Sequence, residues 1–137
     1  GFGRFMDPLA DKILVSSALI SFIALDYVSP LPVMLIIGRE FLITGLRLMV
    51  AYSGVVIPPS WWAKVKTFMQ ISLVGLVLVY INLIKTLEHF NSPALAFFQL
   101  DFRFYFNFLL WITAVITVGT GIDYIVRYFY MIKTVLK

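Results

Sequence analysis

The sequence predicts an all-α, polytopic integral membrane helix bundle. Of its 137 residues, 61% are hydrophobic and 13% are charged, and the mean hydropathy is +0.96. These values lie outside the range of ordinary soluble domains. The apolar residues also gather into four long stretches, and a membrane-spanning helix needs about 20 apolar residues. We therefore expect a single transmembrane domain over residues 1–137.

The four stretches give the expected helices in order. They cover roughly residues 9–28, 32–53, 63–86 and 107–131. Between them lie "SPLP" at 29–32, "SGVVIPPS" at 53–60 and a mixed segment at 85–104. Proline and glycine among polar residues interrupt a hydrogen-bonded helix, so these segments are predicted to be the connections. The absence of cysteine excludes disulfides and thiolate metal sites.

Basic residues set the predicted orientation in the membrane. Most of those near the ends of the spans or beyond them fall on one side, whereas Lys85 and Arg103 fall on the other. The first group consists of Arg4, Lys12, Lys64, Lys66, Arg127, Lys133 and Lys137. Because cytoplasmic segments carry the excess of Lys and Arg, we expect a multi-pass protein of the cell (inner or plasma) membrane whose amino-terminal residues face the cytoplasm. The net charge of +4 suits contact with anionic membrane lipids, and nucleic-acid binding is a poor explanation for so apolar a chain.

Two carboxylates, Asp7 and Asp11, come directly before the first apolar stretch. Residues four apart on a helix share one face, where like charges repel unless a cation lies between them. Mg²⁺ takes carboxylate oxygens and keeps positions open for phosphate, so the pair is a candidate metal site. The alternative is structural: Asp7 caps the helix ahead of Pro8, and Asp11 pairs with Lys12 or Arg4.

The spacing of Gly3, Asp7 and Asp11 resembles the second half of the signature of the CDP-alcohol phosphatidyltransferase family, D-x2-D-G-x2-A-R-x8-G-x3-D-x3-D. "DPLADK", "GREFLITGLR" at 38–47 and "AKVKT" at 63–67 are similar to the bacterial branch of the family that makes phosphatidylglycerophosphate. The first half of the signature is absent. We therefore expect the sequence to be the carboxyl-terminal part of a longer enzyme, with four of the family's six spans.

The resemblance implies a reaction and a set of site residues. The family transfers a phosphatidyl group from CDP-diacylglycerol to an alcohol, here glycerol 3-phosphate, with two divalent ions, Mg²⁺ or Mn²⁺. It implies that Asp7 and Asp11 help to hold the ions and that Asp11 also takes the proton of the attacking hydroxyl. Gly3 would permit close approach of the nucleotide. We also expect a homodimer.

Charged residues inside the second apolar stretch extend the candidate site. A lone Arg or Asp at mid-membrane costs about 2.5 to 3.5 kcal/mol on insertion scales, so Arg39 and Glu40 should face the bundle interior or a wet cavity. Glu40 and Arg47 are predicted to form a structural ion pair beside Thr44. Arg39 and Arg47 are candidates for binding a substrate phosphate, because guanidinium presents a fork of donors.

Two lysines, Lys64 and Lys66, begin the third span at the same surface. They are candidates for the same phosphate, or else anchors to lipid headgroups. Asp123 and Arg127 are predicted to form a local ion pair. Two other functions stay open: a related transferase whose acceptor is inositol phosphate or phosphatidylglycerol, and a non-enzymatic transporter or assembly subunit.

Overall fold

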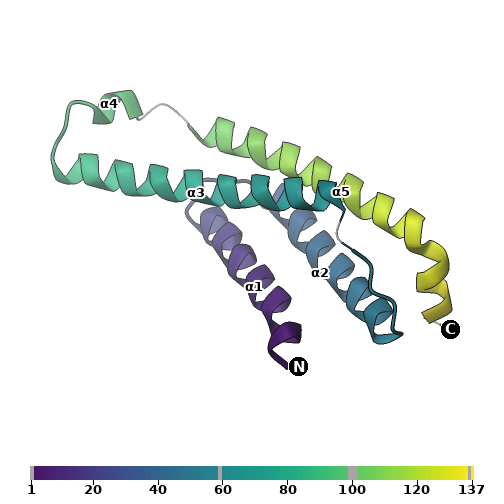
Figure 1. The fold of residues 1–137 in the computed structure, drawn as a ribbon. Helices are drawn as coiled ribbons and strands as arrows, with labels where there is room; N and C mark the ends of the chain where they lie inside the picture. Colours follow the sequence, from purple (N-terminus) through teal and green to yellow (C-terminus); the bar gives the residue numbers. More distant parts are fainter. Residues whose placement is uncertain (1, 59, 99–101, 136) are drawn as a thin grey trace.

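A computed structural model describes residues 2–58, 60–98, 102–135 and 137 of the chain. Its described part consists of helices joined by short connections (Figure 1). The helices are α1 (Phe2–Ala24), α2 (Pro30–Tyr52), α3 (Trp61–His89), α4 (Leu95–Phe98) and α5 (Phe102–Val135). No strand occurs in these residues. The prediction of an all-helical protein is therefore confirmed.

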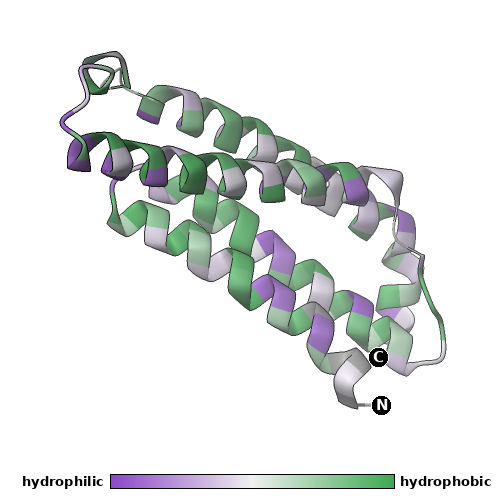
Figure 2. Cartoon of the chain, turned by 60° about the vertical axis from the view of Figure 1, so that its left-hand side comes forward, coloured by the Kyte–Doolittle hydropathy of each residue, from purple (hydrophilic) through white to green (hydrophobic). Residues whose placement is uncertain are grey.

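The four long helices run up and down, so the two chain termini lie at the same end of the bundle (Figures 1 and 2). α5 packs most extensively against α2 and next against α3, whereas α1 packs against α2 and α3. In the described residues no Cα atom of α2 comes within 8 Å of one of α3. These two helices therefore stand apart, and long side chains must bridge the space between them.

Two of the helices, α3 and α5, are long and apolar enough to span a membrane. Figure 2 shows hydrophobic residues along most of the helix surfaces. α1 and α2 are not among these helices, because each carries at least three charged residues in any stretch of 18 residues. The structure thus supports a membrane-type helical protein, whereas the four predicted spans are not confirmed as a count.

The helix boundaries differ from the predicted ones mainly by extension. α1 begins at Phe2, so Asp7 lies inside the helix and the alternative in which it caps the helix is wrong. Pro8 lies inside this helix and removes one of its backbone donors, yet the backbone is helical on both sides of it. α2 begins at Pro30, where the fixed φ of proline favours a first helical turn. The predicted connection at 85–104 contains the short α4, and its residues 99–101 lie outside the described part.

The buried apolar residues form two clusters at different levels of the bundle. The larger cluster takes Val28 from the connection after α1 and the rest of its residues from all four long helices: Leu19, Phe22, Val33, Ile36, Leu73, Val77, Phe106, Leu110 and Ala114. The smaller cluster takes residues only from α2, α5 and the connection before α3: Ile43, Val50, Ile57, Tyr124 and Ile132. Among the side chains that the structure describes, the bundle is therefore closed at the first level, whereas at the second α1 and α3 add no apolar residue to the core.

Candidate functional site

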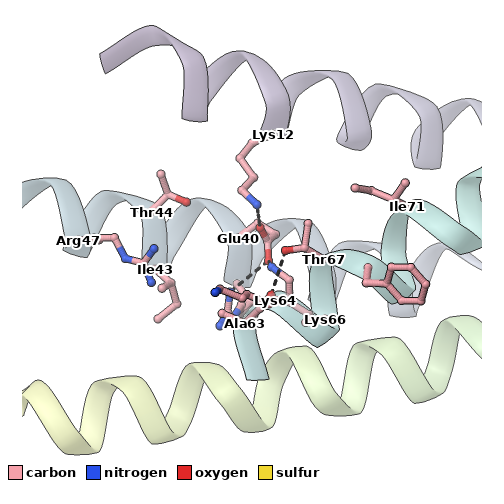
Figure 3. Close-up of a pocket in the computed structure, with 12 residues that line it drawn as sticks. Lys12, Glu40, Ile43, Thr44, Arg47, Ala63, Lys64, Lys66, Thr67 and Ile71 are labelled. Carbon is pink, nitrogen blue, oxygen red and sulfur yellow. Dashed lines mark hydrogen bonds and ion pairs between the residues drawn. The ribbon is translucent and has the colours of Figure 1, made fainter. Parts of the chain in front are cut away.

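Glu40 of α2 is the centre of a buried charge cluster (Figure 3). Its side chain is 3% exposed. Lys12 of α1 approaches Oε2 at 2.5 Å, Arg39 approaches Oε1 at 3.1 Å, and the buried Lys66 of α3 donates to Oε1 as well. A carboxylate removed from water needs paired charge and hydrogen bonds. Glu40 therefore ties its own helix, α2, to both α1 and α3.

The expected pair between Glu40 and Arg47 is wrong. Seven residues span about 10.5 Å along a helix axis, and the lysines of α1 and α3 reach the carboxylate first. Arg47 instead lies over the ring of Tyr124 in α5, with its Cζ 5.6 Å from the ring centroid. The alternative partnership of Lys12 with Asp11 is likewise not found, because Lys12 pairs with Glu40.

A cavity of about 470 Å³ opens beside this cluster. Side chains of α1, α2 and α3 line it, among them Ile43, Phe68 and Ile71. Its charged lining consists of Lys12, Arg39, Glu40, Arg47, Lys64 and Lys66. Five cations and one carboxylate give a formal charge of +4, which equals the net charge of the whole chain. The other charged residues of the sequence cancel, so the entire excess of positive charge surrounds this cavity.

The four basic residues predicted to bind substrate, Arg39, Arg47, Lys64 and Lys66, all line the cavity. Arg39 is only 13% exposed in its side chain, so the prediction that Arg39 and Glu40 face the interior is confirmed. Lys64 is exposed at the rim, where anchoring to lipid headgroups is also open to it. A cavity of this size suits a small ligand, and converging guanidinium and ammonium groups suit a phosphate.

The predicted metal ligands lie on a neighbouring part of α1. Asp7 and Asp11 are both exposed, and neither lines the cavity. Among the described side chains, neither has a hydrogen bond or an ion pair. Their oxygens are free to bind a hard divalent ion, which takes about six oxygen ligands. No group of three or more His, Cys, Asp or Glu occurs in the described residues, so the pair fits a metal as part of a larger ligand set. Gly3 lies exposed in the first turn of the same helix, with open space around its Cα.

Two contributions to the site were missed in the sequence. From the sequence, Lys12 is interpreted only as a marker of orientation and as an alternative partner of Asp11, although its place directly after the aspartate motif is a signal. Thr120 and Tyr124 of α5 contact the two arginines, and nothing in their local sequence pattern indicates this. The predicted pair of Asp123 and Arg127 is confirmed, at 3.4 Å on the exposed side of α5.

The comparisons with known proteins agree with the resemblance read from the motifs. The family model described as CDP-alcohol phosphatidyltransferase matches residues 1–119. The chain belongs to this family, whose members are generally dependent on divalent metal ions. No solved structure gives a significant match.

Named relatives include the CDP-diacylglycerol–glycerol-3-phosphate 3-phosphatidyltransferase of Bacillus subtilis (strain 168). It is 38% identical over 133 residues, which cover 97% of this chain and 62% of that protein. The protein of the same name from Rickettsia felis is 35% identical over 90% of this chain and 61% of its own length. A probable phosphatidylglycerophosphate synthase of Mycobacterium tuberculosis is 48% identical over 75 residues, 55% of this chain and 35% of that protein. The chain thus spans about three fifths of the length of the first two.

Proposed function

We propose that this chain supplies the acceptor pocket and part of the metal site of an enzyme that transfers a phosphatidyl group from CDP-diacylglycerol to sn-glycerol 3-phosphate. The products are phosphatidylglycerophosphate and CMP. The observation that carries the proposal is the cavity whose five cations hold the whole net charge of the chain, in a member of this family. The names of the relatives supply the two substrates.

The acceptor phosphate would lie among Arg39, Arg47, Lys64 and Lys66. Charge-assisted hydrogen bonds from these groups would fix its position, and the ion pairs of Glu40 would keep Arg39 and Lys66 in place before the ligand arrives. Holding the acceptor beside the β-phosphorus of CDP-diacylglycerol lets the two substrates react within one complex, which lowers the barrier to the reaction. The pocket therefore favours an acceptor that carries a phosphate monoester over one that does not, such as phosphatidylglycerol.

Asp11 is proposed as the base of the reaction. It would take the proton of the acceptor hydroxyl as that oxygen forms a bond to the β-phosphorus of CDP-diacylglycerol, while the bond from this phosphorus to the bridging oxygen breaks and CMP leaves with that oxygen. Asp7 and Asp11 would hold part of the coordination sphere of Mg²⁺ or Mn²⁺. Such ions, when bound, neutralise charge on the attacking and leaving oxygens.

The rest of the ligand set would come from the first half of the signature, D-x2-D-G-x2-A-R, on two further helices. The relatives are longer than the matched region, which supports an active form larger than these 137 residues. We propose that the active enzyme has six spans, with the four long helices of this chain as the third to the sixth, that it lies in the inner or plasma membrane with the cavity toward the cytoplasm, and that it is a homodimer.

The test is an assay of CMP release from radiolabelled CDP-diacylglycerol. The 137 residues are expressed alone and behind a two-helix segment bearing D-x2-D-G-x2-A-R, each with Mg²⁺ or with a chelator. Glycerol 3-phosphate, inositol phosphate and phosphatidylglycerol serve as acceptors. We expect Mg²⁺-dependent release only from the longer form and fastest with glycerol 3-phosphate. Full activity of the 137 residues alone would refute the proposed ligand set, and preference for another acceptor would refute the proposed substrate.

A further inference from the structure

One face of α5 lies behind the two arginines of the cavity. Arg39 Nη2 donates to Thr120 Oγ1 at 3.1 Å, and the guanidinium of Arg47 lies over the Tyr124 ring at 5.6 Å. Gly121 is buried between these two contacts along the helix. α2, which carries both arginines, forms its most extensive packing with α5. The α5 face therefore contacts both arginines on the side away from α1.

Gly121 lets Arg39 lie directly against α5. A Cβ atom at this position would come 3.0 Å from Arg39 Cγ and 3.1 Å from its Nε, so the arginine would have to move. At Gly119, two residues earlier, a Cβ would meet nothing within 4 Å. The crowded atoms run from Cγ to Nε of Arg39, and Nε belongs to the guanidinium, so a shift of these atoms moves the guanidinium as well. Arg39 can therefore occupy its observed position only because Gly121 has no side chain.

The two arginines depend on α5 in different ways. The guanidinium of Arg39 is fixed at both ends, by Glu40 through Nη1 and by Thr120 through Nη2. Arg47 has no hydrogen bond or ion pair among the described residues, and its Nε, like that of Arg39, is buried without a partner. The Tyr124 ring is its identified polar contact, since an arginine over an aromatic face is held by electrostatic attraction.

We propose that Thr120, Gly121 and Tyr124 are positioning residues that set how Arg39 and Arg47 present their donors to the anion in the cavity. They thereby determine the affinity for the acceptor phosphate. This inference rests on the proposed function of the cavity. The three residues follow the 1–119 region that the family model matches. Arginines held in the binding geometry lose less conformational freedom when the phosphate arrives.

The experiment compares Gly121→Ala with Gly119→Ala in the enzyme that carries both halves of the signature. Both changes add one methyl group to α5, and only the first meets Arg39. We expect Gly121→Ala to raise the KM for glycerol 3-phosphate about tenfold, because a small misplacement of a binding group is costly, while the KM for CDP-diacylglycerol and the thermal midpoint stay as in Gly119→Ala. Calorimetric titration with inorganic phosphate should show the same loss without turnover.

A second pair of variants keeps the test independent of Gly121. Tyr124→Leu removes the ring and should raise the acceptor KM about fivefold, more than Tyr124→Phe, which keeps the ring. Thr120→Val should raise it more than Thr120→Ser, which keeps the hydroxyl that accepts from Arg39. Rescue by the conservative variant distinguishes positioning from general loss of packing.

Arg39→Ala separates the two proposals. If it leaves the acceptor KM and phosphate binding unchanged, the proposed role of the cavity fails, and the positioning role fails with it. If Arg39→Ala weakens the acceptor while Gly121→Ala behaves like Gly119→Ala and Tyr124→Leu like Tyr124→Phe, the positioning role alone is overturned. Equal rises in both KM values with a lowered thermal midpoint would also overturn it, since they indicate a structural role.

Discussion

The two levels of the bundle are built from the same helices, but one level has an apolar core and the other has a buried charge cluster. At the level of Leu110, all four long helices contribute buried apolar residues to one cluster. At the level of Tyr124, the apolar cluster contains, among the described side chains, residues of α2, α5 and one connection only. There α1 and α3 contribute Lys12 and Lys66, which meet at Glu40. We call the first level the closed half and the second the open half.

The difference shows how a helix bundle holds a cavity. Where apolar side chains meet, two helices approach until these side chains interdigitate. Where lysines from two helices bind one carboxylate, the length of the lysine side chains keeps the helix axes further apart. In the described residues α2 and α3 do not approach within 8 Å between Cα atoms, yet Lys66 and Glu40 connect them. In the open half the charge cluster therefore bridges the space between α2 and α3 with long side chains, and we call it the spacer. Four predictions test this comparison, from the largest expected effect to the smallest.

The largest effect is expected at the edge of the open half, at Asp11. Asp11→Asn should lower kcat by about 10² to 10⁴, the usual contribution of a general base, and should lower the affinity for Mg²⁺ less than Asp7→Asn does, because Asp11 is proposed to act mainly as the base. Asp7→Asn should weaken both Mg²⁺ binding and turnover, because Asp7 is assigned to coordination alone. The measurement is CMP release against Mg²⁺ concentration in the form with both signature halves. Equal losses of Mg²⁺ affinity in the two variants would contradict this division of roles.

The next largest effect concerns the spacer itself. Glu40→Gln keeps the size of the side chain and leaves Lys12, Arg39 and Lys66 around a neutral group. Removing one partner of a buried ion pair costs about 3 to 5 kcal/mol of unfolding free energy. We expect a clearly lower thermal midpoint in detergent, partly restored by inorganic phosphate, because an anion bound to the folded state stabilises it. A midpoint equal to that of the unchanged protein would show that the cluster does not hold the helices.

The cations of the open half are expected to act on the acceptor. Lys66→Ala should raise the KM for glycerol 3-phosphate more than that for CDP-diacylglycerol, since a charge-assisted phosphate contact contributes about 1.5 to 3 kcal/mol. Lys85→Ala is the matched control, because Lys85 is exposed near the far end of α3 and does not line the cavity. An unchanged acceptor KM in Lys66→Ala would return this lysine to a purely structural role.

The closed half was the more predictable of the two from the sequence. Apolar stretches and their proline-rich connections locate the helices, since these signals are local. The motif containing Gly3, Asp7 and Asp11 indicated the family, and the basic residues near Arg39 and Lys66 indicated the cavity. The partners of Glu40 were not predictable, because Lys12 and Lys66 are 28 and 26 residues away in the chain and their distances depend on how helices pack. The contact of Arg39 with Thr120 joins residues 81 positions apart, so the local spacing of residues could not predict it either.

The smallest effect is expected when the ion pair between Asp26 and Arg103 in the closed half is broken. This exposed pair is the comparison for the buried cluster around Glu40. Asp26 pairs with Arg103 at 2.7 Å, but both side chains are exposed, by 74% and 46%. An exposed pair contributes about 0 to 1 kcal/mol. Asp26 also has a positive φ of 64°, a conformation that asparagine adopts readily.

Asp26→Asn therefore removes a weak attraction and places a well-suited residue at the same turn. We expect the thermal midpoint to change by less than about 2 °C, within the shift that a fraction of a kcal/mol produces in a domain of this size, and both KM values to stay unchanged. The same carboxylate-to-amide replacement at Glu40 should cost several times more, because there the charge is buried among three cations. Comparable losses in the two variants would mean that burial of the charge cluster does not distinguish the open half from the closed one.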